Sequence, residues 1–310
     1  MKKLYWSLVS LFCTIGFTAC EGGPFFEPSD REDDLSYLYV KSRKDNVVYY
    51  GYGSDVSTEQ TGSRVFAYEE NRIIGESYDY ALVQYNKGDI LSTQSNHEEV
   101  EYSWNGRVCT QKWESGDIVT EYLDDTYIRV QTLETDNYKL VNEYDGKKII
   151  KESSYVGDNL EYVREYNYNG LTATYTQTNY TDTNSDLNGI LMQRVAGKII
   201  YQDNTYLRVL YQEYECHSNV GDVYKEMTTN TFDGVKLVKS EVRLKGSYNG
   251  YEYEDNALFM RSEYEWEGSK CKVKTIQYHQ DPQPPYNEHN GKVVAITDTE
   301  FEYLDFEPAK

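Results

Sequence analysis

The residues whose type and spacing could bind a metal ion lie in the segment DTNSDLNG at 182–189. Asp182, Asn184 and Asp186 alternate like the first ligands of a calcium loop, in which hard oxygen atoms surround the ion. Leu187 stands where an EF-hand loop requires glycine, and the final bidentate glutamate of such a loop is missing. The segment is a candidate calcium site, and the alternative is a long polar loop between two strands.

Three pairs of aromatic residues, whose members are two positions apart in the sequence, could bind sugar rings. Aromatic rings stack on sugars, and the tyrosine hydroxyl adds a hydrogen-bonding group. Side chains at i and i+2 of a strand point to the same face, so each pair would share one face. The alternative is that tyrosine, which occurs 33 times, fills the strands of a half-hydrated sheet. The possible ligand-stacking residues are Tyr102 and Trp104, Tyr166 and Tyr168, and Tyr264 and Trp266.

The residue types that serve in catalysis do not form a known motif. None of the four histidines, His97, His217, His279 and His289, sits in a zinc-protease motif. The chain has 52 acidic residues, so carboxylate pairs arise by chance and only geometry could reveal a glycosidase dyad. The sequence therefore favours a non-catalytic protein, but it does not exclude an enzyme.

The elements that must position these residues are short β-strands. From about residue 36 to 305, runs rich in Tyr, Val, Ile and Thr alternate with turn residues. Leu160, Tyr162 and Tyr166 fall on one face of their run, and Glu161 and Glu165 fall on the other. Proline, which would remove a ladder donor, is absent between residues 28 and 282. The pattern predicts an antiparallel β domain over 36–310.

Turns with a repeated sequence pattern connect these runs. An aromatic residue, then an acid or amide, then glycine recurs, as in EYDGKK at 143–148. Asn-Gly and Asp-Gly suit a type I′ hairpin turn, which needs positive φ at both corner positions. The glycines are unevenly spaced, whereas a solenoid or propeller would show a steadier period. We therefore expect successive hairpins, with turn-forming glycines at Gly106, Gly146, Gly170, Gly234, Gly250 and Gly268.

The hairpins predict a large curved antiparallel sheet. Closing toward a barrel or a two-layer sandwich would remove its exposed edges. A membrane-spanning barrel is an alternative, because alternating aromatic strands suit it. Segments such as LTATYTQTNY at 171–180 place too many polar side chains on the would-be lipid face to favour it.

The sequence pattern of the turns resembles that of the YD-repeat, or RHS-like, family of bacterial exported proteins. Their hallmark is Tyr-Asp followed shortly by glycine and a basic or apolar residue, and EYDGKKI at 143–149 comes closest. The usual spacer between Asp and Gly is missing here, and the scattered copies cover about a third of the chain. The resemblance implies a curved antiparallel sheet and says little about activity.

The first residues are typical of an exported lipoprotein. Lys2 and Lys3 precede a short apolar run that ends in FTAC at 17–20. This ending resembles the lipobox of bacterial lipoproteins, in which the peptide is cut before an acylated cysteine; Phe17 departs from the usual aliphatic residue. We predict a signal peptide at 1–19 and lipidation at Cys20. The alternative is an ordinary secretory signal that leaves Cys20 unmodified.

The segment that follows is expected to be an acidic, flexible tether over 20–35. EGGPFFEPSDREDD contains glycine, proline and acids without a strand or helix period. Acidic runs next to a lipidated cysteine resemble the surface-export signals of some outer-membrane lipoproteins. The expected location is thus the bacterial cell envelope, with the protein anchored in the outer membrane. The sequence leaves open whether it faces the periplasm or the cell surface.

Charge and cysteine content limit the partners further. The chain carries 31 basic and 52 acidic residues, a formal net charge of −21, which opposes binding to nucleic acid. Cys109, Cys216 and Cys271 allow at most one internal disulfide, and we expect them to be small buried apolar residues. No cofactor is expected apart from the calcium that 182–189 could bind.

These features lead to a membrane-anchored, non-catalytic β protein that binds an extracellular glycan or protein. Two alternatives belong to other classes. One is an enzyme that acts on polysaccharide through carboxylates in a sheet concavity, and the other is a purely structural envelope component.

Overall fold

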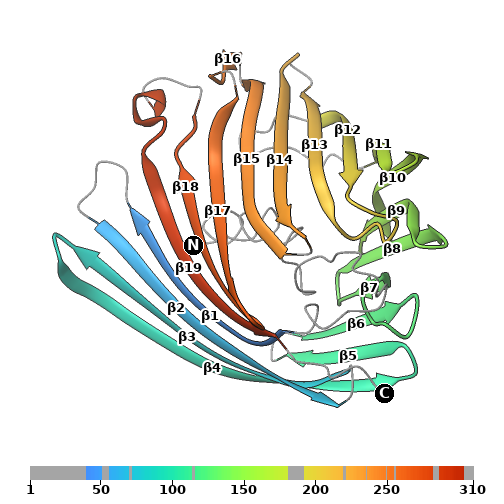
Figure 1. Ribbon diagram of the computed structural model, residues 1–310, viewed down its shortest axis with the longest axis horizontal. Helices are drawn as coiled ribbons and strands as arrows, with labels where there is room; N and C mark the ends of the chain where they lie inside the picture. The colour runs from blue at the N-terminus through green and yellow to red at the C-terminus, as the bar shows by residue number, and fades with distance from the viewer. Residues whose placement is uncertain are drawn as a thin grey trace.

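The computed structural model shows one large antiparallel sheet that curls into a barrel (Figure 1). Within the described residues a 3-10 helix, η2 (Tyr286–His289), is present, and no helix there is long and apolar enough to cross a membrane. The predicted signal peptide and tether, with Cys20, lie outside the described residues, as do Asp182, Asn184 and Asp186. The structure describes residues 40–50, 56–69, 72–113, 116–180, 192–218, 221–234, 236–248, 250–254, 256–281 and 286–303.

The strands fall into three successive groups of six, with β16 (Tyr251–Glu252) as an addition to the third. The first group is β1 (Val40–Tyr50), β2 (Val56–Glu69), β3 (Arg72–Asn86), β4 (Asp89–Asn105), β5 (Val108–Trp113) and β6 (Gly116–Tyr122). The second is β7 (Val130–Glu134), β8 (Tyr138–Asp145), β9 (Lys148–Val156), β10 (Asn159–Asn169), β11 (Thr172–Asn179) and β12 (Met192–Tyr201). The third is β13 (Val209–Ser218), β14 (Val223–Asp233), β15 (Lys236–Tyr248), β17 (Ala257–Glu267), β18 (Lys270–Tyr278) and β19 (Val293–Tyr303).

Pairing between the first and last strands closes the barrel. β1 pairs antiparallel with β19 from Val40 opposite Tyr303 to Tyr49 opposite Ala295, and it also pairs with β2. Eighteen of the nineteen strands, all except β16, therefore form a closed ring. The all-β, antiparallel prediction is confirmed, and closure takes the form of a barrel rather than a two-layer sandwich.

Period-two alternation separates the lumen of the barrel from its outer wall. In β17, Met260 and Ser262 are buried, whereas Glu263 and Glu265 are exposed. In β18, Cys271 and Val273 are buried and their neighbours Lys270, Lys272 and Lys274 are exposed. The buried set faces inward, where apolar and tyrosine side chains pack. The charged set faces outward.

The three groups are equivalent at one end of the barrel, called here the turn end, where Gly106, Gly146, Gly170, Gly234 and Gly268 lie. The last residue of each group donates a backbone hydrogen bond to the turn between its fourth and fifth long strands. These bonds run from Tyr122 to Arg107 at 3.0 Å, from Tyr201 to Leu171 at 2.9 Å and from Tyr303 to Ser269 at 2.9 Å. The barrel is thus built from three copies of a six-strand unit.

A large ring faces a small residue at the same place in each unit. Trp104 pairs with Cys109, Tyr168 with Ala173 and Trp266 with Cys271. The three small residues are at most 1% exposed. An inward ring beside a larger neighbour would overfill this end of the barrel, so the size alternation follows from close packing.

The expected succession of hairpins is confirmed, and the structure groups them into a regular unit that the uneven glycine spacing did not indicate. Gly106, Gly170 and Gly268 mark one turn of the unit, whereas Gly146 and Gly234 mark another. Loops at the opposite end, called the far end, differ in length between units. Spacing counted from glycine to glycine therefore hides the repeat.

The turns also differ from the expected type I′. All six predicted glycines have positive φ, between 60° and 76°, but Asn105 and Asp145 do not. Asn105 pairs with Val108 and Asp145 with Lys148, which places Gly106 and Gly146 at the first of two corner positions. Positive φ at the first corner alone is the type II′ pattern.

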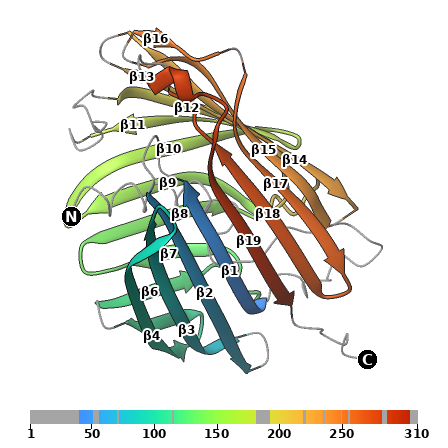
Figure 2. The ribbon, with the colours of Figure 1, turned by 90° about the vertical axis from the view of Figure 1, so that its left-hand side faces the viewer.

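The first unit extends beyond the other two. β2, β3 and β4 have 14, 15 and 17 residues, whereas β8, β9 and β10 have 8, 9 and 11. The additional residues lie at the far end, where the three strands project as a wall (Figures 1 and 2). Gln94 and Asn96 share the inward face of β4 with buried Val100, yet both are exposed. The inward face of this wall is therefore not covered by the packing that fills the lumen at the turn end.

Candidate functional site

The possible ligand-stacking pairs lie on the inward face near the turn end, where the second ring of each pair packs on another ring. Trp104 stacks on Tyr122 with centroids 5.8 Å apart, and Trp266 stacks on Tyr303 at 5.6 Å. Tyr168 has the same relationship to Tyr201 at 6.5 Å. The role of these side chains in this structure is to pack the lumen, and stacking on a ligand stays a prediction.

The same rings also contact a cation and donate a hydrogen bond to a carbonyl group of the preceding hairpin. The indole nitrogens of Trp104 and Trp266 donate to the carbonyl oxygens of Ile73 at 2.7 Å and Leu237 at 2.9 Å. The basic residue just before each carbonyl lies over the ring, 5.6 Å away for Arg72 and 5.5 Å for Lys236. Cation–π contacts of this kind tie successive hairpins together.

Two junction loops between the units form the main polar feature of the turn end, and sequence reasoning missed them. They are 123–129, between β6 and β7, and 202–208, between β12 and β13. The signal was present in the sequence, because YLDDTYIRV at 122–130 and YQDNTYLRV at 201–209 are near copies. Comparing the chain with itself would have found them.

Each junction loop is shaped by an aspartate. Asp124 Oδ1 accepts hydrogen bonds from the backbone N–H of Thr126 at 3.0 Å and from its hydroxyl. Asp203 Oδ1 accepts the same pair from Thr205, with the backbone N–H at 2.8 Å. Asx turns of this kind fix a tight bend.

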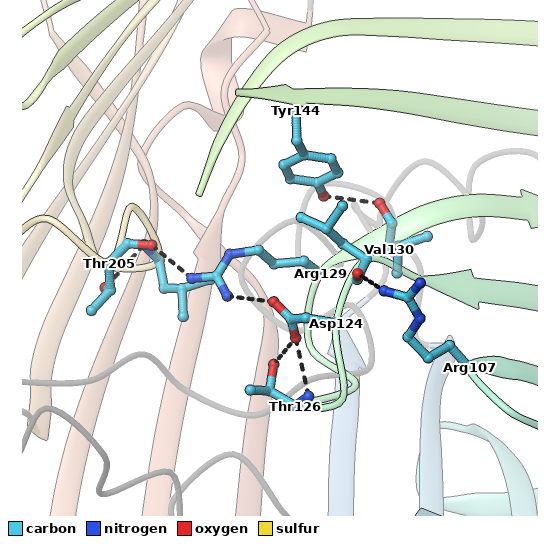
Figure 3. Close-up of polar contacts among 9 residues, drawn as sticks. Arg107, Asp124, Thr126, Arg129, Val130, Tyr144 and Thr205 are labelled. Carbon is cyan, nitrogen blue, oxygen red and sulfur yellow. Dashed lines mark hydrogen bonds and ion pairs between the residues drawn. The ribbon is translucent and has the colours of Figure 1, made fainter. Parts of the chain in front are cut away.

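Each loop also contains a buried arginine, and Figure 3 shows Arg129 between Asp124 and Thr205. Arg129, which is 9% exposed, pairs through Nη1 with Asp124 at 3.2 Å and donates from Nη2 to the carbonyl oxygen of Thr205 at 3.1 Å. Arg208 is fully buried and pairs with Asp203. The two loops therefore meet inside the barrel. Burial raises the pKa of Asp124, but hydrogen bonds from Thr126 and the charge of Arg129 outweigh it, so the pKa is lowered overall.

A buried network of polar groups lines the lumen of the second unit. Glu152 pairs with Arg164 at 2.9 Å and accepts a hydrogen bond from the Tyr162 hydroxyl at 3.0 Å. Arg164 also donates to Gln177 Oε1 at 2.7 Å and lies 4.9 Å from the Tyr175 ring centre. Burial, then the charge of Glu152, raises the pKa of Tyr162 far above its usual value. These groups satisfy one another, as a buried ion pair requires.

The first unit repeats part of this arrangement. Glu76, at the position equivalent to Glu152, pairs with Arg64 at 3.2 Å and accepts a hydrogen bond from the Tyr102 hydroxyl at 2.8 Å. Serine takes the place in the third unit, at Ser240, which pairs with Ser262 across the strands. The carboxylate is therefore a feature of two of the three units.

Glu226 of β14 differs from these carboxylates. Its described hydrogen bond comes from the Tyr224 hydroxyl at 3.3 Å, and Tyr214 lies opposite it on β13. Burial raises the pKa of Glu226, and the Tyr224 hydrogen bond only partly opposes this effect. A carboxyl group held in this way keeps its proton to higher pH than an exposed one.

The outer wall carries rows of opposite charges across neighbouring strands. Glu263 lies opposite Lys239 on one side and Lys274 on the other. Glu300 lies opposite Lys272, with their charged atoms 3.6 Å apart. Cross-strand pairs of opposite charge stabilise a sheet.

Metal-binding and disulfide chemistry are not evident in the described part of the chain. No group of three or more possible ligands there could hold a metal ion. The calcium candidate at Asp182, Asn184 and Asp186 lies outside these residues and stays a prediction. Cys109, Cys216 and Cys271 are buried and free, as small apolar residues would be.

Comparisons with known proteins give only distant structural similarities. No protein-family model matches the chain, and no curated protein matches its sequence. A porin-like protein from Bacteroides uniformis ATCC 8492 is 8% identical over 86% of this chain and 97% of that chain, with a TM-score of 0.41. Another from Bacteroides vulgatus ATCC 8482 is 10% identical over 86% and 99%, with a TM-score of 0.33. The low-pH structure of Pseudomonas putida OprB is 9% identical over 86% and 92%, with a TM-score of 0.35. The barrel described above is established by strand pairing and does not depend on these similarities.

Proposed function

We propose that this protein is a non-catalytic lipoprotein of the outer membrane, held by Cys20, whose barrel stands in water and binds an extracellular partner. The charged outer wall carries this proposal. A barrel inserted in a membrane needs an apolar band on that wall, and a lysine or arginine at the bilayer midplane costs about 2–4 kcal/mol. Lys239, Lys272 and Lys274 all face outward on neighbouring strands, among glutamates.

The position of Val40 supports an orientation for the anchored barrel. Val40 begins β1 opposite Tyr303, at the turn end. The chain from Cys20 therefore reaches the barrel at the end where the junction loops lie. The far end, with the projecting wall of β2 to β4, is left to meet a partner, which is a glycan or a protein.

One observation favours the second candidate, an enzyme that acts on polysaccharide. A general acid in a glycosidase needs a raised pKa, and Glu226 has one. The lumen carboxylates of Glu76 and Glu152 are instead paired with arginines. Loss of a polysaccharide-hydrolysing activity in Glu226→Gln, with unchanged folding, would favour the enzyme.

Cell fractionation of the parent and of Cys20→Ala tests the proposal. We expect fatty-acid labelling of the parent alone, with the parent in the outer-membrane fraction. The Cys20→Ala protein should be recovered in soluble form with the same melting temperature, because its wall needs no lipid. A Cys20→Ala protein that stays embedded in the membrane would show that the barrel itself spans it, and persistent labelling would show that Cys20 is not the acylated residue.

A further inference from the structure

The long strand β4 has one edge that is only partly paired. On one side it pairs with β3 along nearly its whole length, from Asn86 opposite Asp89 to Gly75 opposite Glu101. On the other side β5 pairs with Glu101–Asn105. No described strand pairs with this second edge over Asp89–Val100, and Figure 1 shows β4 running beyond β5 into open space.

The equivalent strands of the other units are not exposed in this way. β11 pairs with β10 from Asn179 opposite Tyr162 to Thr172 opposite Asn169. β18 pairs with β17 over Met260–Glu267. The free edge is therefore a property of the first unit, created by lengthening β4 without lengthening β5.

The centre of this edge carries little of the usual protection, although a bulge lies at Leu91, where Gln84 pairs with Ser92 and Tyr85 with Ile90. An unpaired edge presents backbone N–H and C=O groups to any other strand, and proteins commonly block it with lysine, proline, bulges or a covering element. Leu91–Asn96, with the sequence LSTQSN, contains no charge, proline or glycine. Ile90 and Leu91 at its start are 65% and 58% exposed.

We propose that the free edge of β4 over Asp89–Val100 binds an extended segment of another protein, which adds to the sheet as a further strand. Backbone hydrogen bonds supply the affinity in this mode of recognition, and alternate side chains supply the specificity. The neutral centre of the edge suits β-branched and aromatic side chains. Glu98, Glu99 and Glu101 follow it, so the segment carries lysine or arginine at the end that lies beside them.

A second copy of this chain fits the edge less well. Two copies related by a twofold axis would pair their β4 edges antiparallel. Their turn ends, where Val40 lies, would then point in opposite directions, whereas two copies anchored in one membrane point the same way. This step rests on the proposed lipid anchor at Cys20.

Selection from a displayed library of random twelve-residue peptides, with the full chain extracted in detergent as the target, tests the proposal. We expect peptides that alternate β-branched or aromatic residues and carry a basic end. A selected peptide should bind at least tenfold more weakly when its alternate amides are N-methylated, because this removes the ladder donors and keeps the side chains.

Two separate variants of the chain, Thr93→Pro and Gln94→Pro, are tested for peptide binding in parallel. Amides of neighbouring residues point to opposite edges of a strand, so one of these variants loses a bond to β3 and the other loses a donor at the free edge. The variant that melts like the parent should bind the peptide at least tenfold more weakly. Failure to select any peptide, or peptides that are indifferent to N-methylation and to this variant, would overturn the proposal.

Light scattering of the same samples distinguishes the remaining outcome. A parent that forms dimers, which the edge proline variant separates, would show that a second copy occupies the edge and would count against the proposal. The proposed anchor fails separately, through the labelling of Cys20 described above.

Discussion

Arg129 donates a hydrogen bond from Nη2 to the carbonyl oxygen of Thr205, 76 residues later in the chain, at 3.1 Å. This bond joins the junction loop that ends the first unit to the loop that ends the second. The same guanidinium group pairs with Asp124 of its own loop. One side chain therefore fixes both the shape of a loop and the distance between two units.

Replacing Arg129 by methionine should destabilise the barrel by about 2–4 kcal/mol, because Asp124 and the Thr205 carbonyl lose a buried partner. Thermal or urea unfolding measures the change. Lys139→Met is the matched control: Lys139 pairs with Glu134 at 2.9 Å on the exposed outer wall, and its loss should cost less than about 1 kcal/mol. Equal effects of the two variants would contradict the role given to Arg129.

Gly197 should tolerate no side chain. A Cβ atom there would lie 2.1 Å from Cζ of Tyr175, whose ring is 4% exposed and packs on Tyr166 at 5.3 Å. Gly197→Ala is expected to cost about 1–3 kcal/mol through overpacking. In Tyr175→Leu the same alanine should cost much less, and a double-mutant cycle measures the difference. Additive effects would mean that the tyrosine ring is not the obstacle.

Gly146 is expected to be needed for its backbone conformation alone. Its φ is 60°, and no atom lies within 4 Å of an added Cβ, so space does not limit substitution. Gly146→Val should lower stability by about 1–3 kcal/mol, and Gly146→Asn by less, because asparagine enters this region more readily. Asp145→Asn should melt like the parent, with or without calcium. A calcium-dependent rise in melting temperature that Asp145→Asn abolishes would show that the turn is a binding site.

Glu226 should lower the stability of the parent as the pH rises above the usual range of a glutamate. Burial raises the pKa of Glu226 in the folded protein, so the folded state holds this proton more strongly than the unfolded state does. Glu226→Gln cannot ionise and should therefore melt higher than the parent at pH 7, with the difference disappearing near pH 4. Parallel pH profiles for the two proteins would contradict this assignment.

Much of the local structure could be predicted from the sequence, because local physics sets it. Alternation in runs such as Leu160–Tyr168 requires strands, and a positive φ at a hairpin corner favours glycine at Gly106 or Gly146. The near copies at 122–130 and 201–209 were also readable, although counting glycines did not reveal them. Lipidation of Cys20 is a further prediction from the sequence that this structure does not test.

Other features were decided by the tertiary structure. A period of two residues is the same in every strand, so it does not predict how many strands the barrel contains. That number is fixed by the pairing of the first strand with the last, where Val40 lies opposite Tyr303. The packing of Trp104 on Tyr122 likewise depends on rings brought together by that closure. The free edge of β4 arises because β3 follows it at length and β5 does not. Strand pairing is a contact between distant segments, and its extent is fixed only when the whole barrel has formed.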